Sequence, residues 1–317
     1  MNSNPNHKWQ LRIPDAGSFD FYRQLVEFGW FVENECRFGC RYDLVRWPNH
    51  FWQKVETQML AGLQQFLQND SDGITMLQWY NSGILIKAAG KVLAFDLIPV
   101  PRYYGWPEPD GLTVRIAAAI EALFITHNHQ DHYDEMMVKA CNIAGKSVFM
   151  HPAAAQHGVE IVKLADGASS KIGMITCTAR HASHVWRSRP EEVPLTAFEV
   201  DFAGQYRIVF CGDADYTRGM EGVKPGVDAL FITWRNPGPQ YEDGHPEQTG
   251  TTLDAARLAV ARFKPRRLIL EHYCELDHVY KGFSASYELA ISLIEKIRVP
   301  TSVHFWGDVV KLLGNDA

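Results

Sequence analysis

A cluster of histidines and one aspartate directly follows a short apolar segment, residues 122–125, which predicts a buried strand. The cluster reads Thr126-His127-Asn128-His129-Gln130-Asp131-His132. Alternate residues of an extended segment point the same way, so His127 and His129 can bind one metal ion while Asp131 and His132 face a second. Imidazole nitrogens and carboxylate oxygens are ligands of zinc-like ions, and a catalytic site keeps one position open for water. We therefore expect a site for two metal ions, since a polar loop with histidines by chance would not explain this ordered spacing.

A site for two ions needs more ligands, and three residues at the ends of later strand-like runs can supply them. His181 could complete the ligands of the first ion, Asp213 has a carboxylate that could bridge both ions, and His272 could join the ligands of the second ion. The predicted ligand set is His127, His129, Asp131, His132, His181, Asp213 and His272.

The composition of the 317-residue chain is ordinary for a globular protein, with 46% hydrophobic and 21% charged residues. No apolar run approaches the roughly 18 residues of a membrane span, and the amino terminus carries no secretion signal, so we expect a cytoplasmic protein without a transmembrane segment. The net charge of −6 gives no electrostatic footprint for nucleic acid. Neither a phosphate-binding glycine loop nor the Gly-x-Ser-x-Gly elbow of serine hydrolases occurs. The six cysteines are scattered, which favours buried free thiols over disulfides.

The first seventy or so residues are rich in aromatic residues and amides, whereas short strand-like runs separated by turn residues follow from about residue 73. We therefore expect an accessory segment over residues 1–72 and a main domain over residues 73–317. The accessory segment is rich in aromatic side chains and could pack on the main domain, cover the substrate as a lid, or form an interface in a homo-oligomer. Strands are expected at residues 74–80, 84–87, 92–97, 122–125, 147–150, 172–178, 195–201, 206–211, 229–233, 267–271 and 302–306. Helical patterns follow Asn49, Asp134, Thr251 or Thr252, and Ser284.

The order of the metal-binding motifs resembles the metallo-β-lactamase superfamily, whose members carry His-x-His-x-Asp-His, then a lone histidine, a bridging aspartate and a final histidine, each after a strand. Within it the chain is most similar to the group of ascorbate-6-phosphate lactonases and N-acyl phosphatidylethanolamine phospholipase D. That similarity rests on Leu77-Gln78-Trp79-Tyr80-Asn81-Ser82-Gly83 and Ala179-Arg180-His181. The chain departs from the group at Ala214-Asp215 and at Tyr273-Cys274-Glu275, which puts the shape of the substrate pocket in doubt.

The resemblance implies an α/β protein with an αββα sandwich and a metal site in a cleft at one edge of its two sheets. It also implies two divalent metal ions as cofactors, with zinc as the first candidate and manganese or iron as alternatives. The nucleophile would be a metal-bound hydroxide, and Asp131 would both bind metal and orient this hydroxide. The expected function is a dinuclear hydrolase that cleaves an ester-type bond, a lactone or a phosphodiester, in a small anionic substrate. A mononuclear iron dioxygenase of the same fold and a non-catalytic binding protein remain as alternatives.

Residues near the motifs have further predicted roles. His184, Arg187 and His245 could contact a substrate anion, although His245 fits a plain surface loop equally well. Each metal-binding imidazole needs a hydrogen-bond acceptor for its second ring nitrogen, and Asp96 and Asp134 are candidates. Asp96 could equally cap a turn, and Asp134 the helix that follows it.

Overall fold

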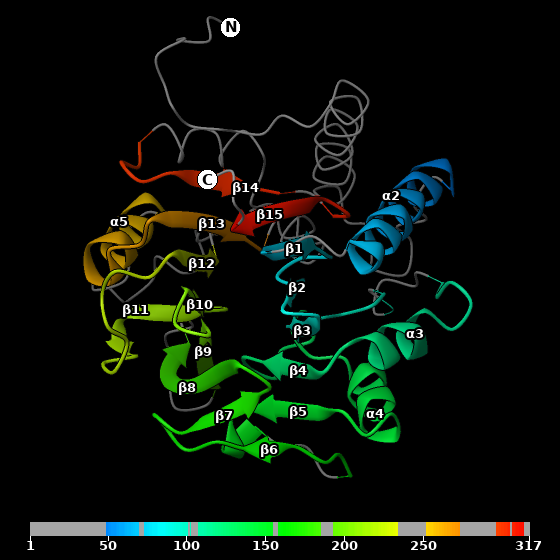
Figure 1. The fold of residues 1–317 in the computed structure, drawn as a ribbon, viewed down its shortest axis with the longest axis horizontal. Helices are drawn as coiled ribbons and strands as arrows, with labels where there is room; N and C mark the ends of the chain where they lie inside the picture. Colours follow the sequence, from blue (N-terminus) through cyan, green and yellow to red (C-terminus); the bar gives the residue numbers. More distant parts are fainter. Residues whose placement is uncertain are drawn as a thin grey trace, which may run out of the picture.

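The computed structural model describes residues 49–69, 73–100, 102, 107–154, 158–184, 193–233, 252–272, 296–304 and 306–313. These residues form two β-sheets that pack face to face, with helices on the outer face of each sheet (Figure 1). This four-layer arrangement confirms the αββα sandwich expected from the sequence. In the described part of the chain, no helix is long and apolar enough to cross a membrane.

The first sheet contains β1 (Ile74–Gln78), β2 (Ile84–Ala88), β3 (Lys91–Phe95), β4 (Ala122–Ile125), β5 (Ser147–Met150), β6 (Val162–Lys163) and β15 (Val309–Leu313). Their order in space is β15-β1-β2-β3-β4-β5-β6. The strands from β3 to β6 run parallel, so their carboxyl ends lie at one edge of the sheet. Helices α2 (Asn49–Gln68), α3 (Leu112–Ala119) and α4 (Glu135–Ile143) lie outside this sheet, and a short 3-10 helix, η3 (Pro152–Ala154), follows β5 (Figure 1).

The second sheet contains β7 (Ser169–Ile172), β8 (Ile175–His184), β9 (Pro194–Phe202), β10 (Tyr206–Phe210), β11 (Ala214–Gly219), β12 (Ala229–Thr233), β13 (Arg267–Glu271) and β14 (Thr301–Val303). Their order is β11-β8-β9-β10-β12-β13-β14, and β7 pairs with β8. Strands β10, β12, β13 and β14 run parallel. Helix α5 (Thr252–Phe263) covers the outer face of this sheet (Figure 1).

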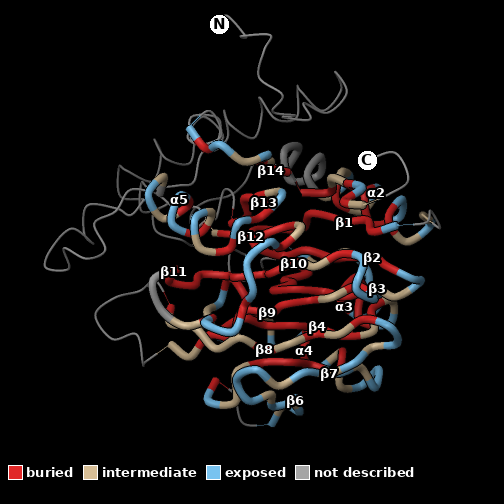
Figure 2. Tube along the Cα trace, turned by 60° about the vertical axis from the view of Figure 1, so that its left-hand side comes forward, coloured by how far each residue is buried: buried red, intermediate tan, exposed pale blue. Residues whose placement is uncertain are grey.

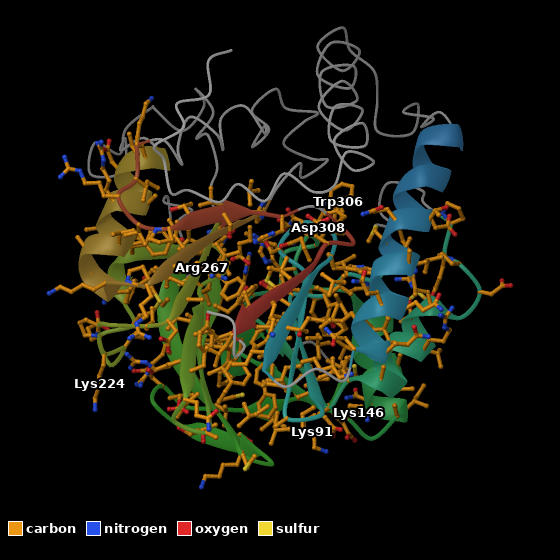
Figure 3. All side chains as sticks on the ribbon, turned by 45° about the horizontal axis from the view of Figure 1, so that its top comes forward. Lys91, Lys146, Lys224, Arg267, Trp306 and Asp308 are labelled. Atoms are coloured by element: carbon orange, nitrogen blue, oxygen red, sulfur yellow. The ribbon has the colours of Figure 1, made fainter. Side chains whose placement is uncertain are left out.

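Aromatic side chains fill the layer between the two sheets. Phe124 of β4 stacks on Phe95 and Phe149 of the neighbouring strands, with ring centroids 5.0 and 4.7 Å apart. It also meets Phe198 of the second sheet edge to face at 5.0 Å. Such contacts add to the free energy gained by burying these large rings. Figure 3 shows that side chains fill the space between the ribbons, while Lys91, Lys146 and Lys224 lie at the periphery.

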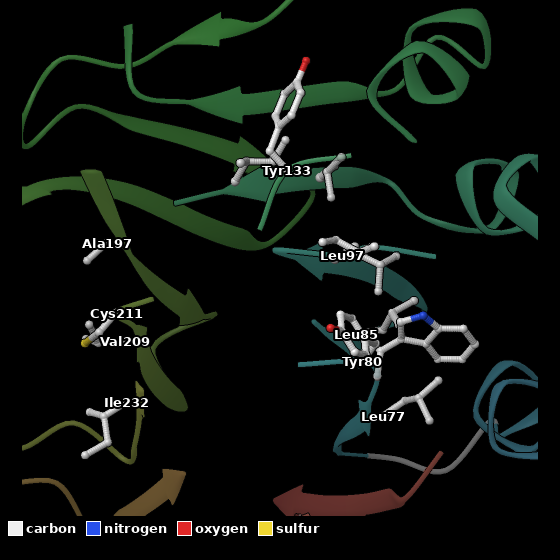
Figure 4. Close-up of a cluster of buried hydrophobic side chains, with 14 of the residues drawn as sticks. Leu77, Tyr80, Leu85, Leu97, Tyr133, Ala197, Val209, Cys211 and Ile232 are labelled. Atoms are coloured by element: carbon white, nitrogen blue, oxygen red, sulfur yellow. The ribbon is translucent and has the colours of Figure 1, made fainter. Parts of the chain in front are cut away.

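The outer faces of both sheets are buried as well, because helices cover them. In β4, Phe124 faces the other sheet while its neighbours Leu123 and Ile125 belong to the cluster under the helices. This explains why the strand is a continuous apolar run without polar alternation. Figure 4 draws members of the outer cluster on both sheets, and Figure 2 shows that the strands are mostly buried whereas the helices expose one side.

Helix α2 packs firmly on the first sheet, since Met59, Leu63 and Phe66 are all buried in its outer cluster. A side chain at Gly62 would come within 2.1 Å of the carbonyl oxygen of Gly307, so glycine is required where the helix crosses the turn before β15. This part of the accessory segment therefore packs against the main domain. Residues 1–48 lie outside the described part, and the domain boundary at residue 73 stays a prediction.

The structure corrects several of the predicted elements. The run 172–178 is two strands, β7 and β8, joined by a turn at Gly173, whose positive φ of 61° suits a tight hairpin. Strand β14 ends at Val303, short of the predicted residue 306. Helix α3 and strands β6, β11 and β15 were not predicted. The helix expected behind Ser284 lies outside the described residues, whereas Cys141, Cys177 and Cys211 are buried free thiols as expected.

Replacing Phe124 with alanine should lower the free energy of unfolding by about 3–5 kcal/mol, because the ring is fully buried and contacts three other rings. Urea denaturation of the purified variant measures this loss. Ile143→Ala is the control, since that side chain is 89% exposed and its removal should change stability by no more than about 0.5 kcal/mol. Equal losses in both variants would contradict the packing described here.

Candidate metal centre

Seven side chains form two adjacent groups that could each hold a metal ion. The first group is His127, His129, His184 and Asp213, and the second is Asp131, His132, Asp213 and His272. Within each group, one ligand atom from every residue lies within 4.8 Å of the others. Asp213 belongs to both groups, so its carboxylate is placed to bridge two ions. These two groups contain six of the seven predicted ligands.

The ligands come from strand ends of both sheets, which meet at one edge of the sandwich. The loop after β4 carries four of them, including His129. His184 is the last residue of β8, and its pairing with Ala214 of β11 places it next to Asp213. His272 follows β13 and adopts a positive φ of 67°. Functional groups at the carboxyl ends of strands are the usual arrangement of α/β proteins.

The second group has the dimensions of a tetrahedral metal site. Zinc held at about 2.0–2.1 Å by four ligand atoms places those atoms about 3.3–3.4 Å apart. His132 Nε2 lies 3.1 Å from His272 Nε2, 3.3 Å from Asp131 Oδ2 and 3.7 Å from Asp213 Oδ1. His272 Nε2 lies 3.0 Å from Asp131 Oδ2 and 3.5 Å from Asp213 Oδ1. The residues therefore fit a divalent ion at this place.

The first group is similarly compact. His127 Nε2 lies 3.0 Å from His129 Nδ1, and His184 Nε2 lies 3.3 Å from Asp213 Oδ2. Asp213 thus turns one carboxylate oxygen to each group. His129 is partly exposed, whereas the other three residues of this group are buried. His129 is therefore the residue of this group that solvent reaches.

A close contact between the two sheets sets the position of Asp213. Gly212 has a positive φ of 52°, and a side chain there would come within 2.5 Å of Thr126 Oγ1. Only glycine allows the turn before β11 to lie against the loop that follows β4. The backbone N–H of Thr196 in β9 also donates to the carbonyl oxygen of Thr126 at 2.9 Å. These contacts hold the ligands of the two sheets in reach of one another.

The buried Asp96 at the end of β3 orients two of the histidines. Its Oδ2 accepts from His132 Nδ1 and from Thr126 Oγ1, both at 2.7 Å. Thr126 Oγ1 in turn lies 3.0 Å from His127 Nδ1 and can accept its proton. Both imidazoles therefore turn Nε2 toward the metal groups, so Asp96 is confirmed as the acceptor of a second ring nitrogen. Asp134 is not: it caps α4 by accepting from the Met137 N–H at 2.9 Å.

The electrostatics of the site keep some imidazoles neutral. Burial, together with the charges of His132 and His184, holds the pKa of His127 well below its ordinary value. Burial and the charge of His184 lower the pKa of His129 to about 4. Burial opposes protonation of His132 too, but the carboxylates of Asp131 and Asp96 outweigh it and raise the pKa of His132 well above normal. Neutral imidazole is the form that binds metal.

His184 takes the place in the first group that the sequence analysis gave to His181. His181 Nε2 lies 3.1 Å from the carbonyl oxygen of Leu164, and its ring packs on His151 with centroids 4.2 Å apart. Strand β8 extends to residue 184, so His184, three residues further along, reaches Asp213. The structure thus brings His184, and not His181, into the first group, while the predicted contact of His184 with a substrate anion stays a prediction. Arg187 and His245 lie outside the described residues.

Thr126 and Asn81 are among the residues that contact the ligands and were not predicted. Thr126 relays the hydrogen bond from His127 to Asp96, and Asn81 lies in the β1–β2 hairpin beside Asp131 and His272. Both occur in segments that the sequence analysis quoted as motifs. The signal was available, but neither side chain has a chemistry that points to a metal site by itself.

Comparison with known proteins agrees with this fold. A family profile described as "Beta-lactamase superfamily domain" matches residues 106–273. No curated protein matches the sequence.

Solved structures share the fold at low sequence identity. A possible metal-dependent hydrolase from Veillonella parvula is 13% identical with a TM-score of 0.52, over 76% of this chain and 99% of that one. Igni18, a metallo hydrolase from Ignicoccus hospitalis, is 13% identical with a TM-score of 0.50, over 75% and 97%. CmlA, a diiron β-hydroxylase from Streptomyces venezuelae, is 14% identical with a TM-score of 0.50, over 77% of this chain. The chain spans only 55% of CmlA.

His184→Ala should remove one tightly bound ion, because it deletes a ligand of the first group. His181→Ala is the matched control, with the same residue type on the same strand, and should keep the metal content of the native protein. Elemental analysis after dialysis measures both. Loss of metal from His181→Ala and its retention in His184→Ala would reverse the assignment.

Asp96→Asn should weaken metal binding about 10- to 100-fold, because the amide has one acceptor oxygen where Asp96 accepts through both, and because it lacks the charge that strengthens His132 as a ligand. Competition with a chromophoric chelator measures the affinity. The exposed Asp254 of α5 supplies the control Asp254→Asn, for which no change is expected.

Proposed function

The chain belongs to the metallo-β-lactamase superfamily, and from this membership we propose that it is a dinuclear metal-dependent hydrolase acting on an ester-type bond of a small anionic molecule. The observation that carries the proposal is the pair of ligand groups sharing Asp213. A shared carboxylate sets two ions side by side, which is the arrangement that supports attack on an ester or phosphoryl group. Bound divalent ions would supply Lewis-acid chemistry, lowering the pKa of water and polarising the substrate.

The residues of the chain have separate tasks in this proposal. The five histidines bind as neutral imidazoles, and Asp96 and Thr126 fix the orientation of two of them. Without metal, the positive charge of His132 outweighs burial and holds the pKa of Asp131 well below its ordinary value. When His132 binds as a neutral imidazole, the divalent ion would supply the positive charge that keeps Asp131 an anion. An anionic Asp131 can bind metal and also accept a hydrogen bond from the attacking water. This hydrogen bond would orient the water.

The ligand chemistry supports zinc as the first candidate metal. Five imidazoles and two carboxylates suit zinc, and iron or manganese also accept such ligands, so availability decides together with affinity. The likeness of the β1–β2 hairpin to lactonases and phospholipase D supports a lactone or a phosphodiester as substrate. The two substrate classes share an electrophilic centre bearing an oxygen that can face a metal ion.

The native protein should contain two ions per chain and hydrolyse a chromogenic phosphodiester or a simple lactone, and chelation should abolish this turnover. Elemental analysis combined with both assays before and after chelation tests the proposal. One iron per chain without hydrolysis would favour the dioxygenase alternative. No bound metal after reconstitution would favour a binding protein that retains the fold.

Asp131→Asn and His129→Ala should each reduce turnover by at least about 10³-fold, because both delete groups that touch the reacting atoms or their ions. Circular dichroism should show an intact fold, since neither side chain belongs to the apolar clusters. Full activity of either variant on a confirmed substrate would falsify the assignment.

A further inference from the structure

Asn81 occupies the turn between β1 and β2 and is fully buried. Its φ of 53° lies in the left-handed region, which asparagine tolerates better than other residues with a side chain. The side-chain amide of Gln78 donates to the Asn81 carbonyl oxygen at 3.0 Å, and the Gly83 N–H donates to Tyr80 at 2.8 Å. The hairpin therefore holds the Asn81 side chain in a defined place.

The amide of Asn81 points at the second ligand group. Its Nδ2 lies 3.3 Å from the carbonyl oxygen of Asp131 and 3.4 Å from His272 Nε2. A carbonyl oxygen only accepts, so the nitrogen of the amide, and not its oxygen, must face this side. His272 Nε2 is the same atom that faces Asp131 Oδ2 and His132 Nε2 in the group. Asn81 thus borders the place where an ion would bind.

A metal ion on His272 would leave one N–H of Asn81 without an acceptor. The lone pair of His272 Nε2 cannot serve both an ion and a hydrogen bond, and the contact of the other N–H with Asp131 is already long. Buried N–H groups almost always have an acceptor. Among the described residues, Oδ1 of Asn81 has no hydrogen-bond partner either. The amide can consequently donate this N–H to a molecule that enters the site when the ion is bound.

We propose that Asn81 is a further active-site residue, which donates Nδ2–H to an oxygen of the substrate that enters the second ligand group. This inference rests on the proposed function and extends it to a substrate preference for molecules that present a carbonyl or phosphoryl oxygen there. A donor of this kind stabilises negative charge that develops on the oxygen during hydrolysis. A purely structural role would require only the contact with Asp131.

Two variants separate these roles. Asn81→Gly keeps the left-handed backbone and deletes the amide, so kcat should fall about 100-fold while zinc affinity stays within about threefold of the native value. Asn81→Asp puts a carboxylate beside His272 Nε2, so the second zinc ion should bind about tenfold more tightly and kcat should again fall. Zinc affinity is measured by competition with a chromophoric chelator, which needs no substrate.

Asn142→Asp is the matched control, because this asparagine of α4 bonds the backbone of Glu160 at an exposed position. It should change neither zinc affinity nor kcat. The proposal would be overturned if Asn81→Asp and Asn142→Asp bound zinc with equal affinity and had equal unfolding midpoints. A kcat of Asn81→Gly equal to that of the native protein would also overturn it. If the native protein hydrolyses nothing, the proposed function fails, and the zinc affinities still decide where the Asn81 side chain points.

Discussion

The carboxylate of Asp96 is the interaction on which the geometry of the metal centre depends. Its two oxygens accept from the backbone N–H and the hydroxyl of Thr126 and from the imidazole of His132, each at 2.7 Å. It therefore joins the end of β3 to both ends of the metal-binding loop. Burial raises the pKa of Asp96 although His132 and Thr126 stabilise its anion, so the site keeps this carboxylate at a cost in stability. That cost is reasonable where orientation of ligands matters more than stability.

Contact between the sheets is the second requirement, because neither sheet carries a complete ligand group. His127, His129, Asp131 and His132 follow a strand of the first sheet, whereas His184, Asp213 and His272 belong to the second. The edge-to-face contact of Phe124 with Phe198 joins the sheets in the apolar layer, and the contact of Gly212 with Thr126 joins them at the edge. A larger side chain in this apolar layer would push the two halves of the site apart.

Much of this could be predicted from the sequence, because the apolar run before His127 and the order of the later ligands leave few alternatives. The ligand on β8 could not be predicted, because His181 and His184 both follow a strand-like run. Only the full length of β8 and its pairing with β11 show which of the two histidines lies beside Asp213. Strand β11 (Ala214–Gly219) carries only Ala214 and Tyr216 as apolar residues, which is too few to predict a strand, and it pairs with β8. Asn81 was missed because its role depends on contacts with Asp131 and His272, which lie 50 and 191 residues away in the chain.

The division of the ligands between the sheets also links metal binding to folding. An ion in the first group would join the loop after β4 to β8 and to Asp213, and an ion in the second would join that loop to β13. Each ion would thus cross-link segments that are far apart in the unfolded chain, where no such group exists. Because ligands that bind only the folded state stabilise it by mass action, the metals would hold together the edge at which we place the proposed reaction.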